Sequence, residues 1–249
     1  MTLRHSVIHI SEQAAQRSGG YREFYGFGQR EGLTSGAMVD LWQGTADVMP
    51  IPPSTGEQMQ VVSTSSNDTS NGTGAQQIHV HYIDSLGVEQ SETKVMNGDT
   101  PVLTTATDIR FVQSLHSWAV GSGGVSAGNI SISKAGVAAT VYNVISAGGN
   151  MSLSAAVMVP AGKEFFMSSW DCSATDNTPV SIRLRATSHF GVLLPGIFLF
   201  HDVTFLESSP QLNPFSVPRK FPSLSIVKVS ALAYSAGAKA SASFEGWIE

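Results

Sequence analysis

The feature that most constrains this chain is the alternation of apolar and polar residues in many short segments. In residues 77–84, Ile78, Val80 and Tyr82 fall on one side of an extended strand, and two histidines fall on the other. The same period of two recurs in residues 129–133, 137–145, 150–159 and 180–187. No sustained period of 3.6 residues is present beyond residues 1–24, so the sequence predicts an all-β fold.

About ten such strands follow one another at intervals of roughly 8–14 residues, with Gly, Pro and Asn between them. This spacing predicts an antiparallel β-sandwich, jelly-roll-like in type, over residues 59–249. Residues 1–58 are predicted to form an extended N-terminal arm, because residues 25–58 are rich in Gly and Pro. This arm is expected to contain short strands and to lie on its own sandwich or on a neighbouring molecule. Within that arm, residues 11–18 favour one or two turns of helix.

Three local patterns give testable details of this fold. The polar segment 89–96 predicts a strand at a sheet edge or in a solvent-exposed sheet. Asn97-Gly98 predicts a hairpin, because a type I′ turn requires positive φ at both central residues. The proline-rich segment 210–222 predicts a loop. In residues 150–159, every second residue from Met151 is apolar, which predicts one long strand with one buried face.

Composition narrows the classes of partner. Charged residues make up 13% of the chain, about half the usual share. The net charge is −5, which argues against nucleic-acid binding, since that requires a basic surface. No apolar run is long enough to span a bilayer, and we expect neither a signal peptide nor a membrane partner. A weakly charged surface favours large permanent protein contacts.

Two residues invite a nucleophilic interpretation. Ser126 lies in a G-x-S-x-G pattern at residues 124–128, but that motif needs a helix after the serine, and residues 129–133 alternate as a strand. The segment is therefore interpreted as a long turn, with an esterase as the alternative. Cys172 is the only cysteine and has no basic neighbour in sequence, so we expect it to be a small buried residue.

His79 and His81 have a spacing that metals use on a strand. Glu89 lies beyond a turn, and no third ligand is set by spacing, so no metal site is predicted.

Carboxylate and tryptophan residues offer further candidates. Glu89 with Glu92, or Asp171 with Asp176, could be imagined as a glycosidase pair, but sequence alone does not supply the required separation. Sugar-stacking residues could be Trp42, Trp118, Trp170 and Trp247. These tryptophans are dispersed and more typical of a core. We therefore expect no catalytic, cofactor-binding or metal-ligating residue, no cofactor, and no enzyme activity.

A set of short motifs is more specific. The chain carries GTGA at 72–75, EQSE at 89–92 and NGDTPV at 97–102, followed by a Gly-rich segment at 121–132 and VPAG at 159–162. Their order and spacing over residues 25–249 resemble a family of tailed-bacteriophage virion structural proteins. Asp99 and Met96 depart from that family's usual Thr and Leu, and residues 1–24 do not match.

The resemblance implies a structural component of a tailed-phage virion. Such a protein would decorate or cement the head, or form part of the neck or tail. Its partners would be further copies of itself, in a trimer, and neighbouring virion proteins. The alternative is a receptor- or glycan-binding module on the virion surface.

Overall fold

The computed structural model describes residues 22–175, 179–207 and 210–249. Over these ranges the chain contains no helix, and hence no helix that could cross a membrane. All pairings between its named strands are antiparallel. The prediction of an all-β, antiparallel fold is confirmed. The helical segment expected at residues 11–18 lies outside the described residues.

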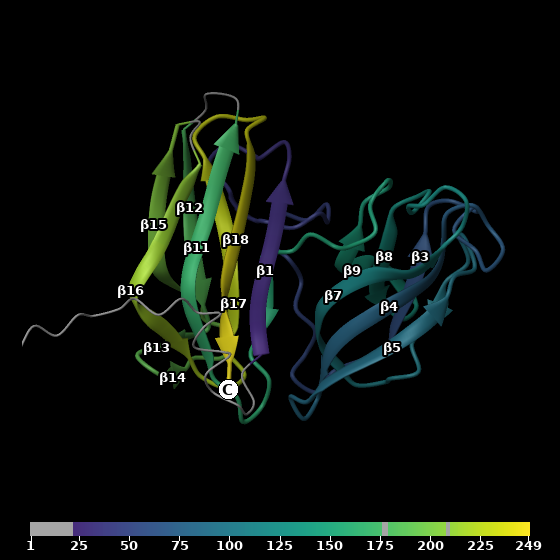
Figure 1. Ribbon diagram of the computed structural model, residues 1–249, viewed down its shortest axis with the longest axis horizontal. Coiled ribbons are helices and arrows are strands. Elements are labelled where there is room, and N and C mark those ends of the chain that lie inside the picture. The colour runs from purple at the N-terminus through teal and green to yellow at the C-terminus, as the bar shows by residue number, and fades with distance from the viewer. Residues whose placement is uncertain (1–21, 176–178, 208–209) are drawn as a thin grey trace, which may run out of the picture.

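The strands form two units (Figure 1). The terminal unit contains a sheet of order β1-β18-β11-β16 and a second sheet of order β10-β17-β12-β15, with β2 also paired to β17. The first sheet comprises β1 (Arg22–Arg30), β18 (Lys239–Ile248), β11 (Phe165–Thr175) and β16 (Gln211–Phe221). The second comprises β10 (Ala156–Met158), β17 (Ile226–Ala233), β12 (Val180–Ala186), β15 (Leu199–Leu206) and β2 (Met38–Asp40). A small ladder joins β13 (Ser188–His189) and β14 (Val192–Leu193).

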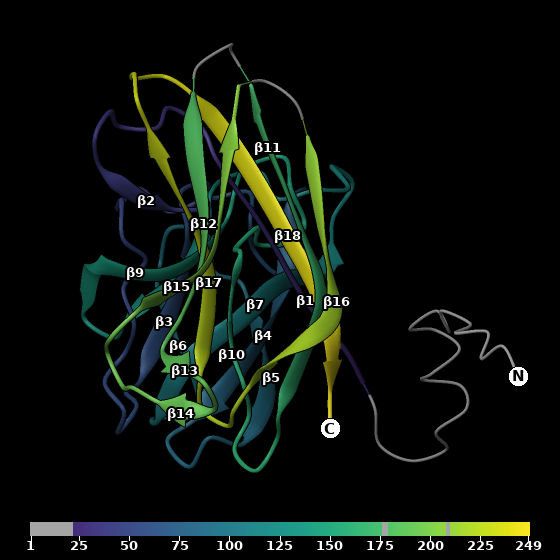
Figure 2. The ribbon, with the colours of Figure 1, turned by 90° about the vertical axis from the view of Figure 1, so that its left-hand side faces the viewer.

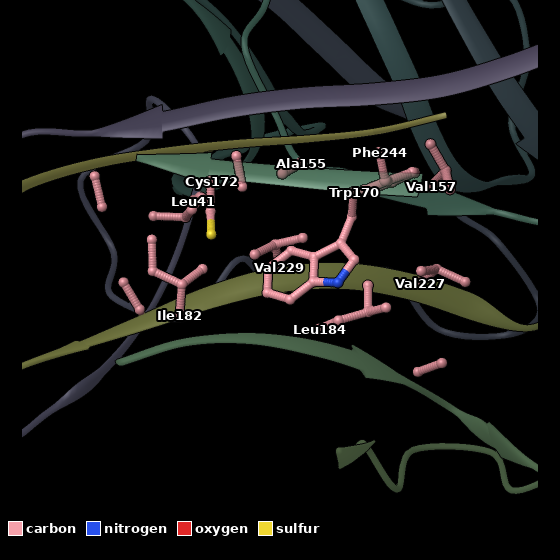
Figure 3. Packing of buried hydrophobic residues seen from close by; sticks show 14 of the residues in the cluster. Leu41, Ala155, Val157, Trp170, Cys172, Ile182, Leu184, Val227, Val229 and Phe244 are labelled. Atoms are coloured by element: carbon pink, nitrogen blue, oxygen red, sulfur yellow. The ribbon is translucent and has the colours of Figure 1, made fainter. Parts of the chain in front are cut away.

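A hydrophobic core fills the space between the two sheets of the terminal unit (Figure 3). Trp170 of β11 lies at its centre and is fully buried, facing Leu184 of β12 and Val229 of β17. The alternation predicted for β12 is confirmed, because its apolar residues enter this core while Arg183 and Arg185 do not.

The close approach of β1 to the core requires a glycine. A Cβ atom at Gly26 would lie 2.5 Å from the ring of Phe244 on the paired strand β18. The Gly-rich sequence of β1 therefore lets an aromatic ring pack directly against backbone.

The inner unit also has two facing sheets, of order β6-β3-β8-β9 and β5-β4-β7. The first comprises β3 (Met59–Ser63), β6 (Val102–Leu103), β8 (Ile130–Lys134) and β9 (Val137–Ile145). The second comprises β4 (Ala75–Asp84), β5 (Glu89–Val95) and β7 (Ile109–Val120). The stripe of Ile78, Val80 and Tyr82 is buried in the core of this unit, as the sequence predicted, and β5 is the predicted edge strand.

A third apolar cluster joins the two units. It contains Trp42 from the segment after β2, Ile83 and Phe111 from the inner unit, and Met158 and Ile226 from the terminal unit. Strand β10 and the residue on either side of it contribute to two cores, because Ala155, Val157 and Val159 enter the terminal core whereas Ala156 and Met158 enter the shared cluster. The long strand expected at 150–159 is therefore short, and Met151 is exposed.

The structure does not divide at residue 58 into an arm and a single sandwich, as the sequence predicts. Strand β1 pairs with β18 and β2 pairs with β17, so residues 22–40 belong to the same sheets as the C-terminal strands (Figure 2). The inner unit is inserted in sequence between β2 and β10, and the region 59–249 contains two units rather than one. Gly and Pro in this region mark edge strands and turns, and the expected short strands pair with strands of the same chain.

A turn is present at Asn97-Gly98, but the prediction of a hairpin there is wrong, because the strands on either side do not pair with each other. Gly98 has a φ of +63°, but the flanking strands β5 and β6 belong to different sheets. The Gly98 amide donates to the Asp68 carbonyl, and the Gly98 carbonyl accepts from the Ser63 amide. These bonds direct the chain across to the other sheet.

The proline-rich loop expected at 210–222 is also wrong, because Gln211–Phe221 forms β16. This strand lies at the edge of its sheet, and Pro214 pairs opposite Ser169 just beyond an irregularity in register. An edge strand tolerates proline, since one side of its backbone needs no partner in the sheet.

Candidate functional site

Three histidines meet on the outer face of the sheet formed by β5, β4 and β7. His79 and His81 lie two residues apart on β4, and His116 of β7 is directly opposite His79 in the antiparallel register. The ring centroid of His79 lies 4.7 Å from that of His81 and 4.9 Å from that of His116. The ring centroids of His81 and His116 are 5.8 Å apart. The inward face of the same strands carries the core residues, so the imidazoles project outward.

Two neighbours complete this group, which we call the histidine face (His79, His81, Thr93, His116 and Trp118). Trp118 stacks on His79 at a centroid separation of 5.0 Å and is 62% exposed. Thr93 of the edge strand β5 lies opposite His79, with its Oγ1 2.9 Å from His79 Nδ1. This hydrogen bond fixes the position of one nitrogen of the His79 ring.

The histidine face disfavours protonation. Desolvation by burial lowers the pKa of His79 below its usual 6.5, and the neighbouring His81 and His116 lower it further. Desolvation, followed by the charge of His81, lowers the pKa of His116. Both rings are therefore neutral at pH 7. In their present side-chain positions, no group of three or more His, Cys, Asp or Glu residues in the described ranges is arranged to hold a metal ion.

This electrostatic arrangement predicts a dependence of stability on pH. The pKa values of His79 and His116 are lower in the folded than in the unfolded chain, so the unfolded state takes up protons first as the pH falls. Their contribution is fully present above about pH 6.5 and is lost as the pH falls below that value. We expect the urea midpoint to fall between about pH 7.5 and 5.5, measured by intrinsic fluorescence.

The control is a His79→Gln/His116→Gln variant, which retains His201. Burial also lowers the pKa of His201, so that residue contributes to the same pH window in both proteins. The midpoint of the variant should fall less than that of the parent. Equal falls would show that the histidine face does not sense pH.

A cavity of about 220 Å³ lies beside the histidine face, between the inner unit and β1 of the terminal unit. His81 lines it together with Tyr25 and Phe27 of β1. An ion pair spans the two units here, because Arg22 Nη2 lies 2.6 Å from each carboxylate oxygen of Glu89. The cavity thus combines exposed aromatic rings with a charged pair.

The structure places the nucleophile candidates in structural roles. Ser126 is 1% exposed, and its Oγ donates to the carbonyl oxygens of Gly149 at 2.9 Å and Ser146 at 3.2 Å. No helix follows it, since the next element is β8. Cys172 is buried in the terminal core, and burial raises the pKa of its thiol to about 12. Neither side chain is prepared for nucleophilic attack.

The described candidate carboxylates lie in different surroundings. Glu89 is held by Arg22, and Glu92 contacts Lys94, with 3.4 Å between Oε2 and Nζ. Asp171 is a residue of β11. Desolvation by burial raises its pKa, and the charge of Glu245 makes a smaller contribution in the same direction. Asp176 lies outside the described residues.

The four tryptophans occupy different environments. Trp42 and Trp170 are buried, as a core interpretation predicts. Trp247 stacks on Phe166, with 5.5 Å between centroids and 11° between planes. Only Trp118 is largely exposed among the four.

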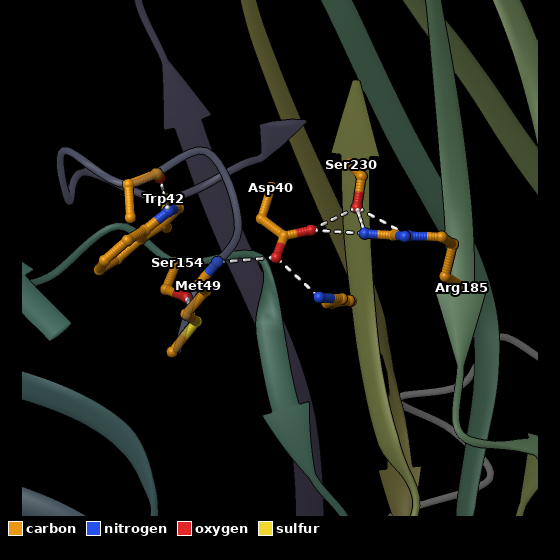
Figure 4. Close-up of polar contacts among 8 residues, drawn as sticks. Asp40, Trp42, Met49, Ser154, Arg185 and Ser230 are labelled. Atoms are coloured by element: carbon orange, nitrogen blue, oxygen red, sulfur yellow. Dashed lines mark hydrogen bonds and ion pairs between the residues drawn. The ribbon is translucent and has the colours of Figure 1, made fainter. Parts of the chain in front are cut away.

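A buried charged cluster lies on the outer side of the second terminal sheet (Figure 4). Asp40 Oδ1 accepts hydrogen bonds from Arg185 Nη2 and Ser230 Oγ, both at 2.6 Å. Asp40 Oδ2 accepts from Lys228 Nζ at 2.7 Å and from the Met49 amide at 2.9 Å. Phe198 covers Lys228, with the ammonium 4.1 Å from the ring centroid. This cluster anchors β2 to β17 and β12.

Strands β15 and β16 lie on the side of the terminal unit that faces away from the inner unit (Figure 1). Strands β15 and β16 are the last strands of their sheets, and Arg219 of β16 approaches Asp202 of β15. Phe205 is 69% exposed and Val217 is 76% exposed. We call the exposed apolar residues of these two edge strands the distal edge, defined by Phe200, Val203, Phe205, Leu212 and Val217.

Comparisons with known proteins add little to this geometry. No protein-family model and no curated protein matches the chain. Among solved structures, the chain is similar to the structure of infectious bursal disease virus Gt strain, with 10% identity and a TM-score of 0.21 over 92% of this chain and 70% of that chain. A likeness at this TM-score supports no conclusion about fold or function.

Proposed function

We propose that this chain is a structural component of a tailed-phage virion, which assembles through protein–protein contacts on the head, in a decoration or cement-like role, or at the neck or tail. The order of the GTGA, EQSE and NGDTPV motifs supports the class of protein. The observation that carries the role in assembly is the distal edge. There, two open sheet edges lie together and expose large apolar side chains.

An open, apolar sheet edge is an aggregation hazard for a free monomer. In a particle, the same edge is covered by a neighbouring subunit, because symmetric copies present matching surfaces. The low charge of the chain fits such contacts. In this proposal each pair of facing sheets is a β-sandwich, and the terminal unit is jelly-roll-like.

The partners in this proposal are further copies of the chain, as a trimer, and neighbouring virion proteins. Light scattering coupled to size-exclusion chromatography tests self-association, and we expect an oligomer for the parent chain. Phe205→Ser with Val217→Ser should shift the mass towards the monomer, since both side chains lie on the distal edge. Leu86→Ser is the matched control, because Leu86 is 77% exposed at the β4–β5 turn, away from that edge.

A strictly monomeric parent, or an oligomer that the distal-edge variant leaves intact, would remove the support that the distal edge gives to assembly.

A receptor- or glycan-binding module is the second candidate. The exposed Trp118 and the neighbouring cavity with Tyr25 favour it, because sugars stack on exposed aromatic rings. A glycan array should then give binding that Trp118→Ala abolishes and Trp247→Ala leaves unchanged.

A further inference from the structure

The backbone places three imidazoles where one ion can reach them. His79 and His116 are directly opposed on neighbouring antiparallel strands, and His81 is two residues from His79 on the same face. Opposed residues on one face have Cβ atoms about 4.5–5.5 Å apart, and diagonal neighbours remain within reach of long side chains. The sequence indicates only His79 and His81, because His116 comes from a strand that is not adjacent to β4 in the chain.

The three rings lie close enough together for one metal ion to reach all of them once the side chains rotate. A zinc–imidazole bond of about 2.0–2.1 Å places the metal about 3.2 Å from each ring centroid. Three rings at that distance, with angles of about 90–130° at the metal, have centroids about 4.5–5.8 Å apart. The centroids of His79, His81 and His116 are 4.7, 4.9 and 5.8 Å apart.

The surroundings suit a metal-bound imidazole. A ligating histidine usually donates its other ring N–H to an oxygen, which fixes the tautomer. Thr93 Oγ1 lies 2.9 Å from His79 Nδ1 and can accept that hydrogen bond, which leaves His79 Nε2 for a metal. Neutral imidazole is the ligating form, so binding is expected at a pH above the ordinary imidazole pKa of about 6.5.

The ring nitrogens do not converge in the present side-chain positions, which hold no metal-ready group within the described ranges. What separates them is side-chain rotation, because the strand register already brings the rings together. Histidine side chains on a partly exposed sheet face can change rotamer without moving the backbone.

We propose that His79, His81 and His116 bind one divalent transition-metal ion of the zinc class, with solvent as the fourth ligand. Imidazole ligands suit zinc, copper and nickel, whereas calcium and magnesium prefer oxygen. The site lies on the inner unit and is independent of the distal edge, so it goes beyond the proposed role in assembly.

Calorimetric titration of the untagged full chain with Zn²⁺ at about pH 7.5 tests the proposal. We expect one Zn²⁺ per chain at this site, and visible ligand-field bands of a four-coordinate ion when Co²⁺ replaces Zn²⁺. His116→Asn should abolish this binding event. Thr93→Val should weaken it by about 10–100-fold, the usual effect of removing an outer-shell partner. Circular dichroism of each variant without metal verifies the fold.

The remaining histidines supply the controls. The chain has seven histidines, and those outside the proposed site are His5, His9, His189 and His201. His189→Asn and a His5→Asn/His9→Asn variant should bind Zn²⁺ with the affinity of the parent. Absence of Zn²⁺ binding, or unchanged binding in folded His116→Asn, would overturn the proposal. Neither result would bear on the oligomeric state, which tests the distal edge separately.

Discussion

Replacing Asp40 with alanine is expected to destabilise the protein by about 3–5 kcal/mol, because it leaves buried cations without their partner. Lys228 is 3% exposed and Arg185 is mostly buried, and both donate to the Asp40 carboxylate. Desolvation already lowers the pKa of Lys228, and Asp40 opposes that shift. Urea unfolding at pH 7 would measure the loss as a lower midpoint.

A second substitution separates this charge effect from simple loss of packing. In the Asp40→Ala background, Lys228→Met removes the unpaired ammonium and keeps an apolar chain of similar length. The double variant should therefore be more stable than Asp40→Ala alone. A loss below about 1 kcal/mol for Asp40→Ala would show that water reaches the cluster and that β2 is not anchored by it.

Replacing Asp68 with alanine should be of similar severity, at about 4 kcal/mol, because this buried carboxylate accepts four hydrogen bonds. Its Oδ1 accepts from the amides of Ala75 at 2.6 Å and Ala127 at 2.8 Å. Its Oδ2 accepts from Ser63 Oγ at 2.5 Å and the Gly128 amide at 2.8 Å. The substitution would leave several buried donors unsatisfied.

The matched control for Asp68→Ala is Asp99→Ala, which removes an exposed carboxylate from the neighbouring NGDTPV motif. It should change stability by no more than about 0.5 kcal/mol. Thermal unfolding of both variants would give the comparison. Similar melting temperatures for the two would contradict a central role for Asp68 in the inner unit.

Asp68 also explains why two glycine-rich motifs occur in this sequence. A Cβ at Gly74 would lie 2.1 Å from Asp68 Oδ1, and one at Gly128 would lie 2.8 Å from Ser63 Oγ. The motifs at 72–75 and 124–128 therefore close around one carboxylate. The serine of the second motif is buried in the same loop, which accounts for its resemblance to a nucleophile motif without its chemistry.

The faces and bounds of many strands could be predicted because they depend on local alternation. The stripe at Ile78 and the alternation in β12 are examples, and β7 occupies the expected range Ile109–Val120. The insertion of the inner unit could not be predicted, because it depends on β1 pairing with β18 at the opposite end of the chain. Strand β16 could not be predicted, since proline signals a loop unless the strand is known to lie at a sheet edge.

The histidine face could be predicted only in part. His79 and His81 are visible from their spacing on one strand. His116 and Trp118 join them because β4 pairs with β7, with β5 and β6 intervening in sequence, and the β4–β7 register contains several irregularities. Local pattern does not fix such a register, so the third histidine could not be assigned in advance.

Quantitative mass spectrometry of purified virions would show whether this chain is part of the particle. A structural component should co-purify with intact particles in a fixed number of copies per particle and be retained after washing in high salt. Its absence from virions whose genome encodes it, or trace amounts that vary between preparations, would contradict a structural role.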